Sequence, residues 1–76
     1  MIMNWLMSPY VNQDAVAGQL YGYRSRLHTR RLQDRLRGTV PFQEWELERL
    51  EIIKRQLLQQ VSENRILAEE ALLALA

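Results

Sequence analysis

Residues 15–29 read AVAGQLYGYRSRLHT, which places Gly18 and Gly22 inside a stretch that otherwise has the composition of a helix. Each glycine costs about 1 kcal/mol relative to alanine in a helix interior. Both belong to a stripe whose members are spaced alternately four and three residues apart: Val11, Ala15, Gly18, Gly22, Ser25, Thr29, Leu32 and Leu36. This heptad spacing is typical of a coiled-coil seam. The small residues in its middle predict that another helix packs closely there.

The first helix is expected over residues 9–37. Ser8 and Pro9 form a favourable helix start, because the hydroxyl can cap and the proline ring pre-sets the first helical torsion. Gly38 follows an arginine-rich stretch, and glycine is common just after a helix end, where basic side chains also suit the helix dipole.

The second helix is expected over residues 41–75, with Thr39 or Val40 preceding Pro41 in its first turn and glutamates near its amino end. A break within residues 61–65, VSENR, is the alternative, because serine and asparagine are weak helix formers. The apolar pattern continues through this stretch and favours one continuous helix.

A short connection between two long helices makes them an antiparallel helical hairpin, so the predicted fold class is all-α. Each helix carries two apolar stripes, and a lone hairpin covers one side of each. The main face of the second helix comprises Leu50, Ile53, Leu57, Val61, Ala68, Ala71 and Leu75. The secondary stripes are Val16, Leu20, Tyr23 and Leu27 on the first helix and Trp45, Ile52, Ile66 and Leu73 on the second. These predict a homodimeric four-helix bundle. The dimer contacts are expected at the small-residue stripe and at the Trp45 stripe, and which stripe faces inward is left open.

Length and composition agree with a small helical assembly. The chain has 76 residues and no cysteine, so oligomerisation is the remaining way to stabilise a domain of this size. Residues 1–8 read as an apolar amino-terminal segment and residues 9–76 as a single helical-hairpin domain. The apolar start is too short for a membrane span and lacks a basic flank, so a cytoplasmic protein is expected.

Candidate chemistry is sparse, and no enzymatic activity, cofactor or metal is expected. His28 is the only histidine and lies one helical turn after Ser25, so a nucleophile and a base could meet in principle. Both belong to a regular helical pattern, which favours a structural role. The glutamates lack the histidine pairing typical of di-metal bundles, and no phosphate-binding loop is present.

Charge is distributed unevenly, and this sets the two functional hypotheses. Residues 1–40 hold six arginines against two aspartates, a net charge of +4, whereas residues 41–76 hold seven glutamates against four basic residues, a net charge of −3. The arginines are Arg24, Arg26, Arg30, Arg31, Arg35 and Arg37. Such charges commonly pair with glutamates of a partner helix, which argues against a nucleic-acid interface. The preferred hypothesis is a dimeric protein-binding adaptor, regulator or chaperone, because each helix carries two apolar stripes and the amino-terminal segment is also apolar. The alternative is a dimeric RNA- or DNA-binding regulator, since arginines bind phosphates bidentately.

Overall fold

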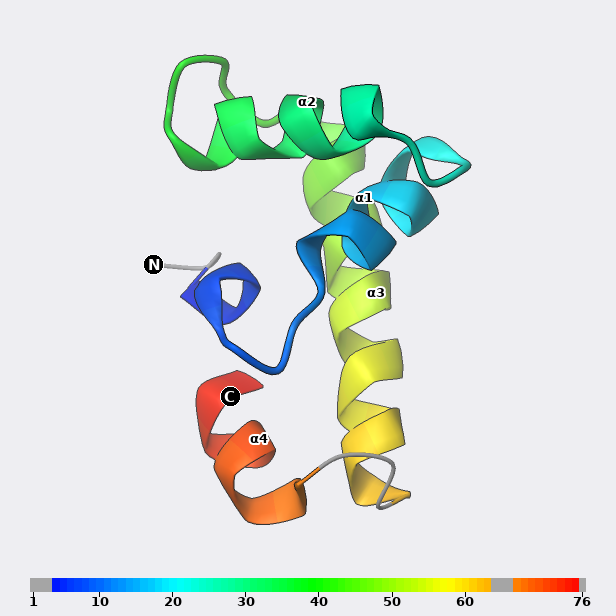
Figure 1. Ribbon diagram of the computed structural model, residues 1–76, viewed down its shortest axis with the longest axis vertical. Helices are drawn as coiled ribbons and strands as arrows, with labels where there is room; N and C mark the ends of the chain where they lie inside the picture. The colour runs from blue at the N-terminus through cyan, green and yellow to red at the C-terminus, as the bar shows by residue number, and fades with distance from the viewer. Residues whose placement is uncertain (1–3, 64–66, 76) are drawn as a thin grey trace.

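The computed structural model describes residues 4–63 and 67–75, and every regular element in these ranges is helical (Figure 1). The elements are the 3-10 turn η1 (Asn4–Met7) and the α-helices α1 (Gln13–Tyr21), α2 (Arg26–Leu36), α3 (Glu44–Ser62) and α4 (Ala68–Leu75). The predicted all-α class is confirmed. The hairpin of two long helices is wrong, because the described part of the chain folds into four α-helices.

The predicted first helix is broken at residues 22–25. Gly22 ends α1 with a φ of 110°, a conformation that residues with a side chain rarely adopt, and its N–H donates to the carbonyl of Gly18 (3.0 Å). Ser25 then caps α2, since its hydroxyl oxygen accepts the backbone N–H of His28 (3.1 Å). The stripe of small residues therefore bends at its centre and does not form a straight seam.

The start of α1 also differs from the expectation at Ser8. Asn12 is the capping residue, and its side-chain oxygen accepts the backbone N–H groups of Asp14 (3.0 Å) and Ala15 (3.3 Å). The Ser8 hydroxyl instead accepts the N–H of Tyr10 (3.2 Å) in the preceding turn. The predicted carboxyl end is confirmed, because α2 ends at Leu36 and is followed by Gly38 at a φ of 83°.

The predicted second helix starts later and ends earlier than expected. Gln43 caps α3 in a capping box, in which the backbone N–H of Gln43 donates to the carboxylate of Glu46 (2.8 Å). The helix ends at Ser62, whose hydroxyl donates to the carbonyl of Gln59 (2.8 Å). Such local bonds compete with helix continuation. One continuous helix to residue 75 is therefore wrong, and Asn64 lies outside the described residues.

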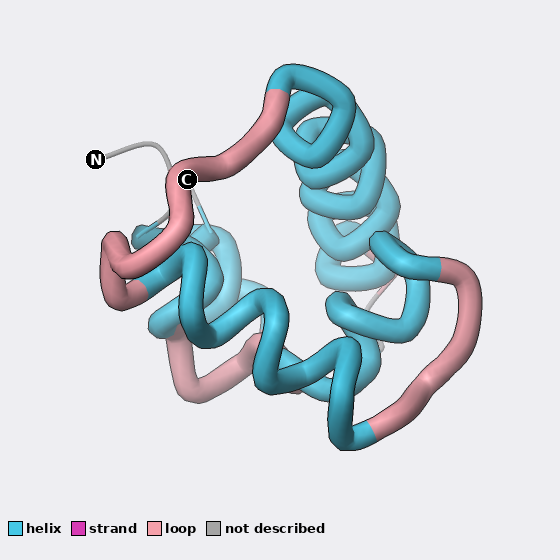
Figure 2. Tube along the Cα trace, turned by 90° about the horizontal axis from the view of Figure 1, so that it is seen from above, coloured by secondary structure: helices cyan, strands magenta, loops and turns pink. Residues whose placement is uncertain are grey.

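Helix α3 is the longest element, and the other elements lie on one side of it and at its amino-terminal end (Figure 1). α1 packs against α3 and α2, while α4 folds back beside α3 and contacts η1. α2 lies beside the amino-terminal end of α3, and the loop of residues 37–43 returns from the far end of α2 to α3 (Figure 2). None of the described helices is long and apolar enough to cross a bilayer.

The core lies between α3 and the elements around it. The main apolar face predicted for the second helix is confirmed as the buried one: its residues are fully buried at Leu50, Ile53, Val61, Ala71 and Leu75, and half-buried at Leu57 and Ala68. Trp5 and Leu6 of η1 are also buried in this cluster. The amino-terminal turn therefore contributes core side chains next to α4.

Candidate nucleic-acid interface

The outward side of α2 carries a row of arginines. Arg26, Arg30 and Arg37 are all exposed, and with Gln33 they follow each other at spacings of four, three and four residues. Residues so spaced lie on one side of a helix, because an α-helix turns once every 3.6 residues. His28 and Leu32 point the other way and are buried. The helix thus turns its basic side to solvent.

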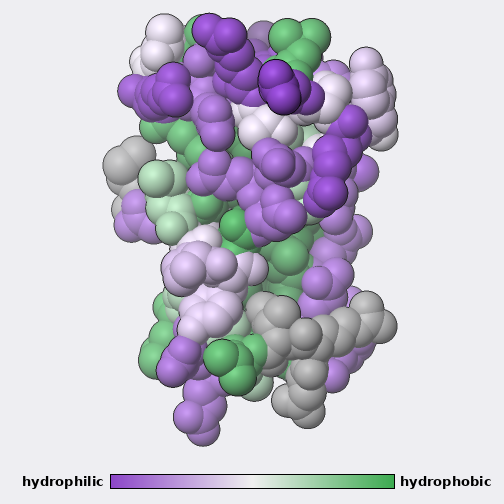
Figure 3. Space-filling model, viewed as in Figure 1, coloured by the Kyte–Doolittle hydropathy of each residue, from purple (hydrophilic) through white to green (hydrophobic). Residues whose placement is uncertain are grey.

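These arginines line a depression of about 520 Å³ beside α1. Its walls are formed by Asp14, Arg24, Ser25, Arg26, Thr29, Arg30, Gln33 and Arg37. The side chains come from the start of α1, the turn at residues 22–25 and α2, so the break at Gly22 is what brings them together. On the face that Figure 3 shows, strongly hydrophilic residues accordingly gather at the end of the molecule where α2 lies. Four guanidinium groups against one carboxylate make the depression suited to an anion.

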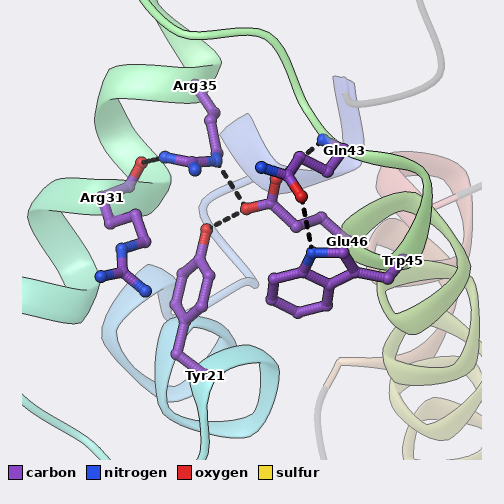
Figure 4. A network of polar contacts seen from close by, with 6 residues as sticks. All are labelled: Tyr21, Arg31, Arg35, Gln43, Trp45 and Glu46. Carbon is purple, nitrogen blue, oxygen red and sulfur yellow. Dashed lines mark hydrogen bonds and ion pairs between the residues drawn. The ribbon is translucent and has the colours of Figure 1, made fainter.

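The remaining two arginines are used within the fold (Figure 4). The Nε of Arg35 lies 2.5 Å from the carboxylate of Glu46 on α3. The guanidinium of Arg31 lies over the ring of Tyr21, 5.0 Å from the ring centroid. Arginine–glutamate pairing at the start of the second helix is therefore found at Arg35 alone among the described residues.

Glu46 is the buried centre of this network, with a fully covered side chain. Its carboxylate accepts hydrogen bonds from the hydroxyl of Tyr21 (2.5 Å) and the backbone of Gln43 (2.8 Å), besides the ion pair with Arg35. Burial by itself raises the pKa of Glu46, but the hydrogen bonds and Arg35 outweigh burial and hold the pKa below its ordinary value. The carboxylate is thus charged at neutral pH and joins the end of α1 to α2.

Two aromatic rings pack near Tyr21, the hydroxyl donor to Glu46. The ring of Tyr21 lies 5.5 Å from that of His28 and 6.0 Å from that of Trp45, measured between centroids. Burial, followed by the hydrogen bond to Glu46, raises the pKa of the Tyr21 hydroxyl far above its ordinary value. The phenol therefore remains protonated and remains a donor to the carboxylate.

The candidate pair of Ser25 and His28 is engaged in other contacts. The Ser25 hydroxyl accepts the backbone N–H of His28, whereas the imidazole Nδ1–H donates to the carbonyl of Tyr23 (2.6 Å). The ring of Tyr23 lies 4.6 Å from the imidazole. Both side chains therefore stabilise the turn and the start of α2. No group of three or more potential metal-ligating side chains lies together among the described residues.

The predicted stripe of small residues lies in part against the chain's own turn. Val11 and Leu32 are buried, and Gly22 is exposed. The other members are half-buried: Ala15, Gly18, Ser25, Thr29 and Leu36. A Cβ added at Gly18 would lie 3.2 Å from the backbone of Arg24, whereas one added at Gly22 would meet nothing within 4 Å. The close neighbour of Gly18 is thus the turn that follows it.

The secondary apolar stripes divide between core and surface. Val16 and Leu20 are buried, whereas Tyr23 and Leu27 are exposed. On the second stripe, Trp45, Ile52 and Leu73 are all exposed, and Ile66 lies outside the described residues. Trp45 and Ile52 are two turns apart on one side of α3, and the indole N–H of Trp45 donates to the side chain of Gln43 (3.0 Å).

Sequence reasoning missed the role of Glu46, which it treated only as one acidic residue near a helix start. The signal was the spacing of Gln43 and Glu46, because a polar residue followed three positions later by glutamate marks a capping box. Its partners Tyr21 and Arg35 are distant in sequence and carried no such signal. No family model, curated protein or solved structure matches this chain, so its function must be argued from the geometry of α1, α2 and Glu46.

Proposed function

We propose that the chain is a non-enzymatic nucleic-acid-binding module that contacts phosphates with the exposed arginines of α2 and of the residues that flank it. The observation that carries this proposal is the depression lined by Arg24, Arg26, Arg30 and Arg37, none of which forms an ion pair within the described residues. Like charges gathered in this way repel one another, and a polyanion relieves that repulsion.

The alternative explanation, charge pairing within the chain, accounts for Arg35 alone. Arg35 is nearly buried and bound to Glu46, whereas the four depression arginines are exposed. One carboxylate opposes an anion in the depression, that of Asp14, and α2 itself carries one more, that of the half-buried Asp34. The basic groups outnumber them, and guanidinium groups are the side chains that best match phosphate oxygens.

A salt titration tests this proposal. Binding of a labelled duplex of about 20 bp is measured by fluorescence anisotropy between about 50 and 200 mM salt. Four phosphate contacts are expected to give a slope of log K against log salt of about −3 to −4, and each lost contact reduces it by about 1. Replacing Arg26 and Arg30 by glutamine should therefore lower both the affinity and the slope.

The matched control is Arg55→Gln, which removes the same charge from an exposed position of α3 outside the depression. This variant should leave the binding nearly unchanged. If neither duplex nor single-stranded nucleic acid binds at low salt, or if Arg55→Gln weakens binding as much as the α2 variants do, the proposal is refuted.

Self-association is the second proposed function, and the exposed stripe on α3 supports it. Trp45 and Ile52 are 48% and 45% exposed, and both are large apolar side chains on one helix side. A second copy of the chain would bury them, as the predicted homodimer requires. Sedimentation equilibrium should show a dimer that Ile52→Glu dissociates and that Leu47→Glu, at an exposed apolar position on the other side of the same helix, does not. A wild-type chain that remains monomeric at all micromolar concentrations would contradict self-association. The expected cytoplasmic location stays a prediction.

A further inference from the structure

The segment from Gln13 to Leu36 forms a helix-turn-helix unit. α1 has nine residues and α2 has eleven, and residues 22–25 connect them. Two helices joined by a turn of three to four residues, often with a glycine, form the unit that presents its second helix to the major groove of duplex DNA. Here Gly22 supplies the positive φ at the turn, and Ser25 caps the second helix.

Local packing keeps this turn tight. The backbone of Arg24 approaches Gly18 so closely that a Cβ there would lie 3.2 Å from it. The imidazole Nδ1–H of His28 donates a hydrogen bond to the carbonyl of Tyr23 within the turn (2.6 Å). The turn is therefore attached both to α1 and to the first turn of α2, which fixes where α2 begins.

The two helices are also joined from behind by α3. The carboxylate of Glu46 binds Tyr21, the last residue of α1, and Arg35, near the end of α2 (Figure 4). One buried group thus sets the orientation of α2 relative to α1. α2 lies at the outer end of the molecule, so its basic side is open to a ligand (Figure 1).

The side chains exposed on the first half of α2 are suited to reading bases as well as binding phosphates. Arg26 and Arg30 lie one turn apart on the basic side, and arginine makes bidentate hydrogen bonds to the N7 and O6 of guanine. Leu27 stands between them in sequence and is 66% exposed. An exposed leucine contributes nothing to a phosphate contact, but apolar side chains pack on the thymine methyl group in the major groove.

We propose that α2 enters the major groove of B-form DNA, where Arg26, Leu27 and Arg30 contact base edges. Arg24, in the turn, and Arg37, after the last turn of α2, contact the flanking phosphates. On a duplex without the recognised sequence, Arg26 and Arg30 contact phosphates as well, as in the proposed function. This inference rests on the proposed nucleic-acid binding and adds the ligand class and its mode of reading. The B-form major groove admits an α-helix, whereas the major groove of duplex RNA is too deep and narrow for side chains to read.

The first test asks whether binding selects a sequence. Duplexes that bind the full chain are enriched from a pool with a randomised centre, at a salt concentration where bulk binding is weak. The enriched set should share a short element that contains a guanine. The same element made as duplex RNA should bind at least about tenfold more weakly, because the helix cannot reach the bases.

The second test separates base reading from phosphate contact. In the enriched duplex each guanine is replaced by its 7-deaza analogue, which lacks the N7 acceptor and leaves the phosphates unchanged. Affinity should fall by about fivefold or more, within the range expected for one bidentate contact. Replacing Arg26 and Arg30 together by glutamine should abolish this difference in affinity. Leu27→Ala should weaken the preference for thymine. The matched control Arg37→Gln should weaken binding to all duplexes alike and should leave the difference in affinity between the guanine and 7-deazaguanine duplexes unchanged.

The outcomes distinguish this inference from the proposed function. Salt-dependent binding without enrichment, equal on DNA and RNA duplexes and insensitive to the analogue, refutes groove reading and leaves phosphate binding in place. Absence of binding to every nucleic acid at low salt refutes both. Circular dichroism of each variant verifies the fold, which these exposed positions should not disturb.

Discussion

Replacing Glu46 by glutamine tests the central contact of this fold most directly. The substitution keeps the side-chain volume and removes a fully buried charge that is bound to Arg35 and Tyr21. Removing one partner of a buried ion pair typically costs about 3–5 kcal/mol, because the other charge is left uncompensated. The Arg35 side chain is 13% exposed and can regain part of its hydration, so the lower end of that range is expected.

A loss of this size is large for such a small chain. A stability of about 0.05–0.15 kcal/mol per residue gives about 4–11 kcal/mol for a chain of 76 residues. Urea denaturation followed by circular dichroism at neutral pH should therefore show a much lower midpoint for Glu46→Gln. The control Glu48→Gln, at an exposed position of the same helix, should change stability by less than about 0.5 kcal/mol.

A double-mutant cycle attributes the loss to the ion pair. Arg35→Met removes the other partner, and the two substitutions together should cost less than the sum of their separate effects by about 1–3 kcal/mol. If Glu46→Gln costs no more than the control, or if the cycle shows no coupling, Glu46 does not join α2 to α3 in the way argued above.

Three further predictions follow from described contacts. Because the pKa of Glu46 is lowered in the fold, the charged carboxylate contributes its full stabilisation above the ordinary pKa of 4.5. This stabilisation is lost as the pH falls through the folded-state pKa. Urea midpoints of the wild type should therefore decline over that acidic range, and those of Glu46→Gln should decline less. Gly18→Ala should have a net cost of up to about 2 kcal/mol, because overpacking against the Arg24 backbone, about 1–3 kcal/mol, exceeds the gain of about 1 kcal/mol in helix propensity. Gly22→Ala should cost about 1–2 kcal/mol through its positive φ alone. Urea denaturation measures both, and a Gly18→Ala variant more stable than the wild type, or a Gly22→Ala variant as stable as the wild type, would contradict the stated cause. Ser25→Ala should cost about 1 kcal/mol through loss of the α2 cap, measured in the same way, and Ser25→Asp, which can also cap, should retain most of the stability.

The features that could be predicted from sequence are those set by local pattern. The apolar face of the second helix, with Leu50, Ile53 and Val61, follows from helical period and is buried. The end of α2 near Gly38 follows from the preference of glycine for positive φ after a helix. Both depend on residues within a few turns of one another, so no tertiary information is needed.

The breaks in the helices show where pattern reading fails. Gly22 and Ser25 are ordinary signals for a helix end and a helix start, yet they also fit a heptad stripe that continues on both sides. A periodic stripe persists through a turn if the turn has a suitable length, so the stripe cannot distinguish one helix from two. The packing of Arg24 on Gly18 favours the turn, and that contact exists only once the chain has folded back.

Only part of the candidate site could be predicted from the sequence, for the same reason. Sequence identifies the set of arginines, but their division into structural and exposed members depends on the direction in which α2 leaves the turn. That direction places Arg35 against Glu46 and points Arg26 and Arg30 to solvent. Long-range partners of this kind leave no local signal, apart from the capping-box spacing at Gln43 and Glu46.

The fold and the proposed interface are therefore coupled through charge. Gathering four arginines around one depression disfavours the folded state, because like charges repel. The buried contact of Arg35 with Glu46 stabilises the same helix from the opposite side, where solvent screens it least. Because Glu46 also binds the last residue of α1, one carboxylate both offsets part of the repulsion on α2 and fixes the direction in which its basic side points. A neutral replacement of Glu46 would alter the orientation of α2 and so weaken nucleic-acid binding at the proposed interface, although the Glu46 side chain itself lies away from that interface.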